Sequence, residues 1–396
     1  MVVISEIPDD GDPNKKPQEE EVQHNLPTSF AEIPNDIIET CIATRVRRCH
    51  YPELSRTSRF FHGLMKETRL YEKRSSLGLA ESVLYALIRS PPHDPPSWYI
   101  LHGNNNSRRL CRINLDRAMP LGCAVVTIGP EIYVIGGSVG QNMRTSGVFL
   151  IDCRFHRSCS LPSMRMDRYG AAAGVIDGKI YVIGGCEDRP LPYDCVEVFD
   201  VKTQVWEMCG LNLASETKFV AYVVMEEKIY VLDAQKCFAF EPRERKWQHW
   251  LKRPWYRPCC VVDDLLYTML GHFLFVYDPK ENSLRRVRGL DGLPILYDPK
   301  KKSWRPAGAV DGLPCLVYNE SEMANLGGKL VILGTSEQDL WIEAEKEAVK
   351  EAHLWCVEIA LERREDGEVW GNVESATLVL TSDISPSIEL CRTVTI

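Results

Sequence analysis

The chain has 396 residues with 47 Lys and Arg against 55 Asp and Glu, and the net charge of −8 disfavours a duplex nucleic-acid binder, which needs a basic field to replace phosphate counterions. Apolar residues make up 44% and charged residues 26%, which excludes a fibrous or wholly disordered chain and allows two or three domains. Fifteen cysteines without a Cys-x-x-Cys pair disfavour a secreted disulfide framework or a zinc module, and favour reduced thiols in the cytoplasm and/or nucleus.

Residues 1–28 are polar and contain several prolines, with too little apolar content to form a core, so we expect a disordered tail. The start of the chain has no basic segment followed by a long apolar run, and a secretory signal is therefore not expected. No apolar run approaches the ~18 residues of a membrane helix. Association with a membrane is not predicted.

Residues 29–75 have few prolines, and their apolar residues recur every three or four positions, which predicts a small all-α domain. A first helix is expected to be capped by Asn35 or Asp36. A second is expected to begin at Pro52, because proline favours the first helical position. Residues 76–96 predict a third helix and then a stiff proline-rich linker. The apolar residues of this third helix are Leu79, Val83, Leu84, Leu87 and Ile88.

Residues 97–396 consist of short β-branched and aromatic runs between turn residues, and several of these runs repeat. Ile132-Tyr-Val-Ile-Gly-Gly137 returns at residues 180–185, with weaker copies from residues 229, 266 and 330. A period of roughly forty to fifty residues with four strands per unit is typical of β-propeller blades. Units are assigned to residues 118–164, 165–210, 214–250, 255–316 and 318–380, and residues 97–115 are expected to close the ring with the C-terminal residues.

A second repeated element follows these runs: an aromatic-acidic pair, and usually a tryptophan six residues after the acid. The acid is expected to accept backbone hydrogen bonds in a turn, and the indole to fill the gap to the next blade. The glycine pairs are assigned a structural role, because glycine permits a tight turn close to a neighbouring backbone. The scaffold residues of both kinds are Gly136, Gly137, Gly184, Gly185, Trp206, Trp247 and Trp304.

Residues 297–316 repeat residues 277–296, with 11 of 20 aligned positions identical. We interpret the second copy as a tandem duplication of one outer strand pair, arising in the genome or from an error in the gene prediction. It predicts a redundant strand pair or loop near residues 285–310, and not a separate blade. Without these 20 residues the β region has room for about six blades, with five or seven left open.

The glycine pairs, the Tyr-Asp pairs and the spaced tryptophans resemble kelch repeats. Phe30-Ala-Glu-Ile-Pro-Asn-Asp-Ile-Ile38 and Ser58-Arg-Phe-Phe-His-Gly-Leu64 are similar to the F-box of plant F-box/kelch-repeat proteins, with Ile33 in place of the usual leucine and Arg59 in place of the usual lysine. The resemblance implies a multidomain chain, in which a small all-α F-box domain precedes an all-β kelch-type propeller of about six blades, some of them degenerate.

The same resemblance implies a substrate-recognition subunit of an SCF-type E3 ubiquitin ligase. The F-box would bind a Skp-type adaptor and through it a cullin, and the propeller would bind a target protein. A helical unit of about 45 residues cannot bury all of its apolar surface, so part of it is available to a partner. The candidate adaptor-binding residues, about half of which we expect in the core of the unit itself, are Ile33, Pro34, Ile37, Ile38, Leu54, Phe60 and Leu64.

The aromatic and basic run at residues 247–256 is a candidate target-binding loop, because Trp, Tyr and Arg dominate recognition hot spots. Its candidate residues are Trp250, Arg253, Trp255 and Tyr256. If the tryptophans are buried between blades, this interpretation is lost.

Catalysis is not predicted. The nine histidines have no metal-ligand spacing, no Gly-x-Ser-x-Gly elbow is present, and the Glu-x-x-x-Asp-x-x-x-His iron motif of some kelch proteins resembling plant specifier proteins is missing. We assign no catalytic residue, metal or other cofactor. Two alternatives stay open: a kelch propeller that acts as an interaction scaffold without a ligase role and, with less support, a metal-dependent propeller enzyme.

Overall fold

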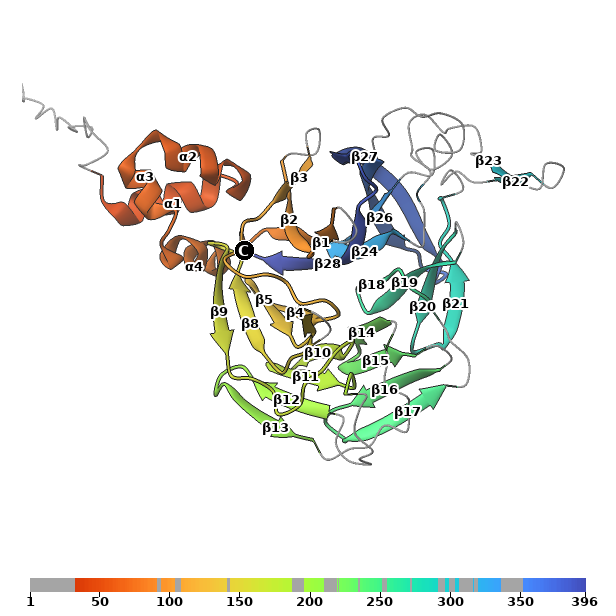
Figure 1. The fold of residues 1–396 in the computed structure, drawn as a ribbon. Helices are drawn as coiled ribbons and strands as arrows, with labels where there is room; N and C mark the ends of the chain where they lie inside the picture. Colours follow the sequence, from red (N-terminus) through yellow and green to blue (C-terminus); the bar gives the residue numbers. More distant parts are fainter. Residues whose placement is uncertain are drawn as a thin grey trace, which may run out of the picture.

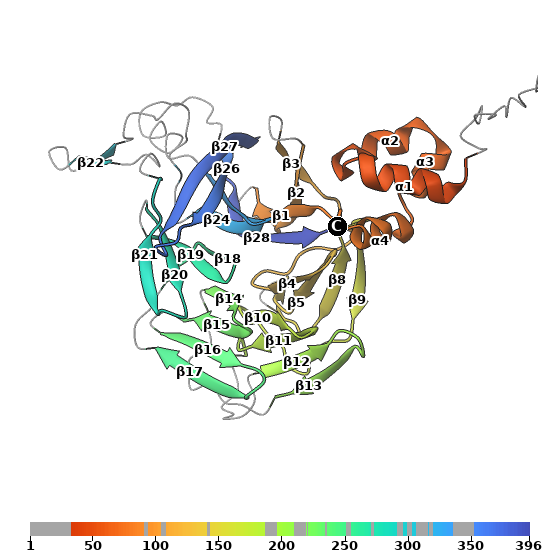
Figure 2. The same cartoon turned by 180° about the vertical axis from the view of Figure 1, so that it is seen from behind.

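The computed structural model contains a helical unit (residues 33–79) beside a six-bladed β-propeller, as Figures 1 and 2 show from opposite sides. The predicted fold class is thereby confirmed. The tail expected at residues 1–28 lies outside the described residues. These are 33–90, 94–103, 108–140, 143–186, 196–209, 219, 221–233, 236–250, 255–270, 273–290, 296–298, 303–305, 316, 320–335 and 352–396.

The helical unit comprises α1 (Asn35–Arg45), the 3₁₀ turn η2 (Arg48–His50), α2 (Tyr51–Thr57), α3 (Arg59–Leu64) and α4 (Thr68–Ser76). Neither Asn35 nor Asp36 caps α1, contrary to the prediction, because both are already helical. Pro34 occupies the cap position. Its carbonyl oxygen accepts hydrogen bonds from the backbone N–H of Ile37 and of Ile38, at 3.0 and 3.2 Å.

The second predicted helix is divided in two at Ser58. This residue has an extended backbone (φ −157°, ψ 160°) and its Oγ accepts a hydrogen bond from the Phe61 N–H at 3.2 Å. A serine oxygen that satisfies a first-turn N–H is a standard helix N-cap. The serine therefore ends α2 and begins α3.

Residues 82–89 form the strand β1 (Ser82–Arg89), and the third predicted helix is wrong. β1 pairs antiparallel with β2 (Ser97–His102) on one side and with β28 (Ser387–Thr395) on the other. Leu84 through Ile88 are all buried, because a strand covered on both faces is apolar without alternation. Such a run also satisfies helical spacing, and the propeller begins at residue 82 instead of residue 97.

Each blade is a four-stranded antiparallel sheet, and the described residues contain six. Blade 1 consists of β28, β1, β2 and β3 (Arg109–Arg112). Blade 2 consists of β4 (Ala124–Ile128), β5 (Glu131–Ile135), β8 (Val148–Asp152) and β9 (Arg157–Leu161), with a short hairpin of β6 (Ser138–Val139) and β7 (Met143–Arg144). Blade 3 consists of β10 (Ala172–Ile176), β11 (Lys179–Ile183), β12 (Val196–Asp200) and β13 (Val205–Met208).

The other three blades follow in chain order. Blade 4 consists of β14 (Ala221–Met225), β15 (Lys228–Leu232), β16 (Cys237–Glu241) and β17 (Lys246–Trp250). Blade 5 consists of β18 (Cys259–Val262), β19 (Leu265–Leu270), β20 (Phe273–Asp278) and β21 (Ser283–Arg286). Blade 6 consists of β24 (Glu322–Leu326), β25 (Lys329–Thr335), β26 (Ala352–Arg363) and β27 (Val369–Ser382).

The first strand of each blade lies nearest the axis, and β28, β4, β10, β14, β18 and β24 contact one another in turn around it (Figure 1). Blade 1 closes the ring, because it combines the C-terminal strand with three strands from the beginning of the propeller. The closing residues 97–115 do lie in this blade, with β1 between them and β28.

Both glycine pairs have a left-handed backbone and lie close to other segments of the chain. Gly137 has φ +99°, and a Cβ there would come within 2.7 Å of the Pro120 Cβ. Gly136 has φ +62°, and a Cβ there would come within 2.8 Å of the Arg168 carbonyl oxygen. Gly184 and Gly185 have φ +69° and +78°. A larger residue would be strained at these positions, which gives the pairs a structural role.

The aromatic-acidic turns form as predicted, but the indole packs in the other direction. Asp200 Oδ1 accepts hydrogen bonds from the backbone N–H of Lys202 and Thr203 at 2.9 and 3.0 Å. Trp206 donates its indole N–H to the Pro162 carbonyl oxygen at 2.8 Å, and Trp247 packs against the apolar residues of blades 3 and 4. These tryptophans therefore fill the gap to the preceding blade and not to the next one. Trp304 lies in β23, and its side chain is outside the described set.

The duplicated segment forms a hairpin of its own, made of β22 (Leu296–Asp298) and β23 (Ser303–Arg305). Tyr297 pairs with Trp304 in this hairpin, and the equivalent residues of the first copy, Tyr277 and Leu284, pair in the same way in blade 5. Only the first copy joins β19, because it follows that strand directly and completes the four-stranded sheet. Among the described strands, β22 and β23 pair with no blade, as expected of a redundant strand pair.

Deletion of residues 297–316 is expected to leave the thermal midpoint unchanged to within about 2 °C. The deletion removes no strand from a blade, and it brings Leu296 to the place of Leu316, which packs in the apolar cluster between blades 5 and 6. The four residues Asp-Gly-Leu-Pro stand before this position in both copies. Differential scanning calorimetry of the two proteins tests the prediction. A fall of more than about 5 °C would show that the hairpin supports blade 5.

Candidate adaptor and target sites

The helical unit divides the seven candidate adaptor-binding residues by burial. Ile38 and Leu64 are each 5% exposed and belong to the core, and Ile33 and Leu54 are partly buried against it. The remaining three are exposed. They are Pro34 before α1, Ile37 on α1 and Phe60 on α3. Four of the seven are therefore buried or partly buried within the unit, and three lie at its surface.

A single arginine holds the helical unit together. Arg74 of α4 is buried, and its Nη1 donates to the carbonyl oxygens of Ala43 and Val46, both at 3.0 Å. Its Nη2 donates to the Leu79 carbonyl oxygen at 2.7 Å and to the Glu81 carboxylate at 2.5 Å. Ala43 and Val46 lie at the C-terminal end of α1, and Leu79 and Glu81 lie between α4 and β1, so the arginine links both helices to the start of β1.

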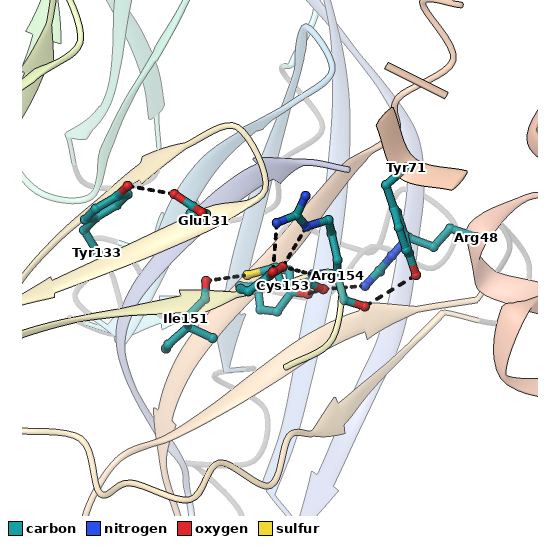
Figure 3. Close-up of polar contacts among 9 residues, drawn as sticks. Arg48, Tyr71, Glu131, Tyr133, Ile151, Cys153 and Arg154 are labelled. Carbon is teal, nitrogen blue, oxygen red and sulfur yellow. Dashed lines mark hydrogen bonds and ion pairs between the residues drawn. The ribbon is translucent and has the colours of Figure 1, made fainter. Parts of the chain in front are cut away.

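The helical unit is also fixed to blade 2, at the turn between β8 and β9 (Figure 3). Arg48 Nη2 donates to the Cys153 carbonyl oxygen at 2.7 Å, and the Tyr71 hydroxyl donates to the Arg154 carbonyl oxygen at 3.4 Å. The Tyr71 ring stands edge-on to Phe155, with ring centroids 5.5 Å apart. One apolar cluster runs from the helices into blades 1 and 2. The unit is therefore a packed part of the molecule.

The turn that receives the helices is itself held by polar contacts. Arg154 pairs with the Asp152 carboxylate at 2.8 Å, and the Tyr85 hydroxyl donates to the Cys153 carbonyl oxygen at 3.2 Å. Burial raises the pKa of the Cys153 thiol to about 12, so the thiol is protonated near neutral pH. The Tyr133 hydroxyl donates to Glu131 at 2.7 Å on the neighbouring strand (Figure 3). These groups support the junction between the two domains.

The helical unit and one mouth of the central channel lie at opposite ends of the propeller. The turn containing Cys153 lies beside the β4–β5 turn, since its N–H donates to the Pro130 carbonyl oxygen at 2.9 Å. The β4–β5 turn lies at the C-terminal end of β4, whereas residues 120–123, which line the channel mouth, lie at its N-terminal end. An inner strand runs from one end of the propeller to the other. A partner on the helices therefore leaves this mouth free.

The structure describes the side chains of two of the four candidate target-binding residues, and these two do not form a common surface. Trp255 is fully buried between blades 4 and 5, where it packs with Tyr230, Leu266 and Tyr277, so its hot-spot role is wrong. Tyr256 is 40% exposed. Trp250 is the last residue of β17, and its side chain is outside the described set. Arg253 lies outside the described residues altogether. The buried tryptophan supplies blade packing, as the alternative interpretation required.

The central channel contains charged residues that the sequence analysis missed. At the mouth just described, Arg257 forms an ion pair with Glu322. Deeper, Arg392 of β28 donates from Nη2 to the Tyr222 hydroxyl at 3.2 Å. The sequence gives only a weak indication of this site. Arg257 directly follows the aromatic run, but the other residues come from three separate strands. Only the ring closure places them on one axis.

No group of three or more His, Cys, Asp or Glu side chains among the described residues is placed to hold a metal ion. No helix within the described ranges is both long and apolar enough to cross a membrane.

Comparisons with known proteins agree with this architecture. A family model described as "FKB95, Kelch-repeats domain" matches residues 84–296, which begins inside β1. A kelch repeat-containing protein of Arabidopsis thaliana is 43% identical over 439 residues, and an F-box/LRR-repeat/kelch-repeat protein of the same plant is 43% identical over 419 residues. An F-box/kelch-repeat protein of that species is 41% identical over 416 residues. Each alignment covers 100% of both chains. The chain therefore belongs to the plant F-box/kelch-repeat protein family.

Proposed function

We propose that this protein is the non-catalytic substrate receptor of an SCF-type ubiquitin ligase. Its helical unit binds a Skp-type adaptor, which links it to a cullin, and its propeller binds the target protein. The observation that carries the proposal is the helical unit itself: Pro34, Ile37 and Phe60 remain exposed on or beside α1 and α3, while Ile38 and Leu64 of the same helices are packed inward. The F-box in the names of the relatives supports the same role.

The junction between the domains supports this division of labour. Arg48 and Tyr71 fix the helices to blade 2, so an adaptor on α1 and α3 has a fixed position relative to the propeller. A target at the far mouth of the channel does not compete with it. The ubiquitin-conjugating chemistry would then come from the other subunits.

The double variant Ile37→Ala/Phe60→Ala is expected to weaken adaptor binding at least tenfold, because two apolar anchors lose their contacts with the partner. Binding to an immobilised Skp-type adaptor is measured by surface plasmon resonance. The matched control is Ile384→Ala/Phe273→Ala on the propeller. Its isoleucine and phenylalanine are 50% and 44% exposed, against 49% for Ile37 and 40% for Phe60. The control is expected to bind like the wild type.

A kelch scaffold without a ligase role is the second candidate. Two relatives that cover the full chain are named only by their kelch repeats, and a helical unit packed on the propeller could serve as a purely structural part. In that case the wild-type protein does not bind the adaptor. If instead the double variant binds as tightly as the wild type, the adaptor uses another surface.

A further inference from the structure

The central channel contains a cavity of about 350 Å³ at the mouth away from the helical unit. All six blades contribute to its wall. Three aromatic rings line it, from Tyr169, Phe219 and Tyr222, together with apolar residues such as Leu121 and Leu390. A volume of this size lies at the lower end of the range for small-molecule sites, which are mostly apolar with a few fixed polar groups.

The floor of this cavity is formed by Arg392 and Tyr222. Arg392 donates from Nε to the Val125 carbonyl oxygen at 3.1 Å, from Nη1 to the Cys391 carbonyl oxygen at 2.8 Å and from Nη2 to the Tyr222 hydroxyl. The Val125 N–H in turn donates to the same hydroxyl at 3.2 Å. These bonds join blades 1, 2 and 4 across the axis. Arg392 lines this cavity and a second one on the other side of the floor.

The cavity wall carries two arginines and two glutamates, and Arg392 is the arginine that forms no direct ion pair with either glutamate. Glu322 is paired with Arg257, and Glu389 is paired with Arg89. All of the Arg392 contacts given above are to neutral acceptors, and no carboxylate among the described residues lies within ion-pair distance of it. A guanidinium has five N–H donors, and these contacts use three. A cation held away from bulk water is costly until an anion compensates it.

The thiols in the wall are not nucleophiles. Burial raises the pKa of Cys123 to about 12, and it raises the pKa of Cys259 as well. Both are therefore protonated near neutral pH and act as small apolar groups. These two thiols therefore offer no reactive thiolate to a ligand in the cavity.

We propose that this cavity binds a small organic carboxylate with an aromatic body, whose carboxylate contacts Arg392 and whose ring packs among Tyr169, Phe219 and Leu390. A carboxylate would form a direct ion pair with Arg392 and accept its two remaining N–H groups, and charge-assisted bonds of this kind are the strong ones. The aromatic rings and apolar side chains of the wall provide the matching surface for the body of the ligand. The same carboxylate chemistry could come from an acidic side chain of a protein, and the experiment distinguishes the two sources.

The test uses 2-naphthoate as the probe and 2-naphthamide as its neutral isostere, with the full-length protein and isothermal titration calorimetry. Neither adaptor nor target is needed, so the result is independent of the proposed ligase role. Wild-type protein is expected to bind the carboxylate at least about tenfold more tightly than the amide. Equal affinity for the two, or no binding of either, would overturn the proposal, and this outcome requires no variant.

Variants then locate the carboxylate. Arg392→Gln is expected to remove the preference for 2-naphthoate, and Arg392→Lys is expected to keep part of it because the charge remains. The control is Arg243→Gln, which removes an exposed arginine paired with Asp177 and Glu227 in the outer turns, and the preference should persist. If Arg392→Gln folds and keeps the full preference, the carboxylate binds elsewhere and the assignment to Arg392 is wrong. If Arg392→Gln does not fold, Arg392→Lys decides, and an unchanged preference in that variant has the same meaning.

The second source is tested with N-acetyl-glutamate methylamide, which presents an acidic side chain on a peptide backbone. The expected affinity is at least about tenfold weaker than that of 2-naphthoate, because this probe has no ring for the apolar wall. A tighter complex with the glutamate probe would show that the site receives an acidic side chain of a protein, and the small-molecule assignment would be wrong.

Discussion

Glu197→Ala is expected to lower the free energy of unfolding by about 3–5 kcal/mol. Glu197 and Arg168 are both fully buried between blades 2 and 3, with Arg168 Nη2 at 3.0 Å from Glu197 Oε1. The same carboxylate accepts the backbone N–H of Arg165 at 2.7 Å and of Met166 at 3.2 Å. The alanine variant leaves a buried guanidinium and two N–H groups without these partners, and such groups are costly inside a protein.

Loss of the Glu197 carboxylate should also disturb the glycine pairs, because Arg168 is hydrogen-bonded to both. Arg168 Nη1 donates to the Gly184 carbonyl oxygen at 2.6 Å, and the Arg168 carbonyl oxygen accepts the Gly137 N–H at 2.7 Å. Urea unfolding followed by tryptophan fluorescence measures the change. Glu197→Gln keeps the shape and part of the bonding, and an intermediate loss is expected. Arg243→Gln, which breaks the exposed pairs with Asp177 and Glu227, is the control and should unfold like the wild type. If Glu197→Ala also unfolds like the wild type, the buried pair is not needed for stability.

Trp255→Ala is expected to lower the free energy of unfolding by about 3–5 kcal/mol. The side chain is completely buried in the cluster between blades 4 and 5, and alanine would leave a large cavity there. Trp255→Phe is the matched variant, because it keeps an aromatic ring and removes an indole N–H that has no hydrogen-bond partner among the described residues. It should lose much less stability than the alanine variant.

The neighbouring residue separates packing from recognition. Tyr256 is exposed, so Tyr256→Ala should change stability by less than about 1 kcal/mol. Thermal unfolding of the three variants is compared with that of the wild type. If Trp255→Ala keeps the wild-type midpoint, the indole is not a packing residue, and its interpretation as a binding residue returns.

The helical region shows how far local patterns reach. Apolar spacing predicted helices near the correct residues between 29 and 75. The pattern of an amphipathic helix depends only on residues three or four positions apart, so it can be seen in the local sequence. The same spacing failed at residues 82–89. There Leu84 and Leu87 belong to a strand that is hydrogen-bonded to β28, about 300 residues later in the chain. Nothing in the sequence around residues 82–89 indicates the register of that pairing.

The candidate sites divide in a similar way. An aromatic run is a fair signal of a hot spot, but burial decided against Trp255 and left Tyr256 at the surface. The charged channel residues share no sequence pattern, although Arg257 directly follows the aromatic run. Arg257, Glu322 and Arg392 come from three blades and meet only because the ring closes.

The sequence by itself determined a helical segment followed by a repeat with a period of roughly forty to fifty residues, a structural role for the glycine pairs, and a duplicated segment outside the repeat. These features depend on spacing within one unit, where local geometry fixes the structure. Only the tertiary structure decided that residues 82–89 are a strand, that the first copy of the duplication completes blade 5, and that Arg392 lies on the channel axis without a carboxylate within ion-pair distance among the described residues. Each of these depends on segments far apart in the chain, which come into contact only when the six blades close into a ring.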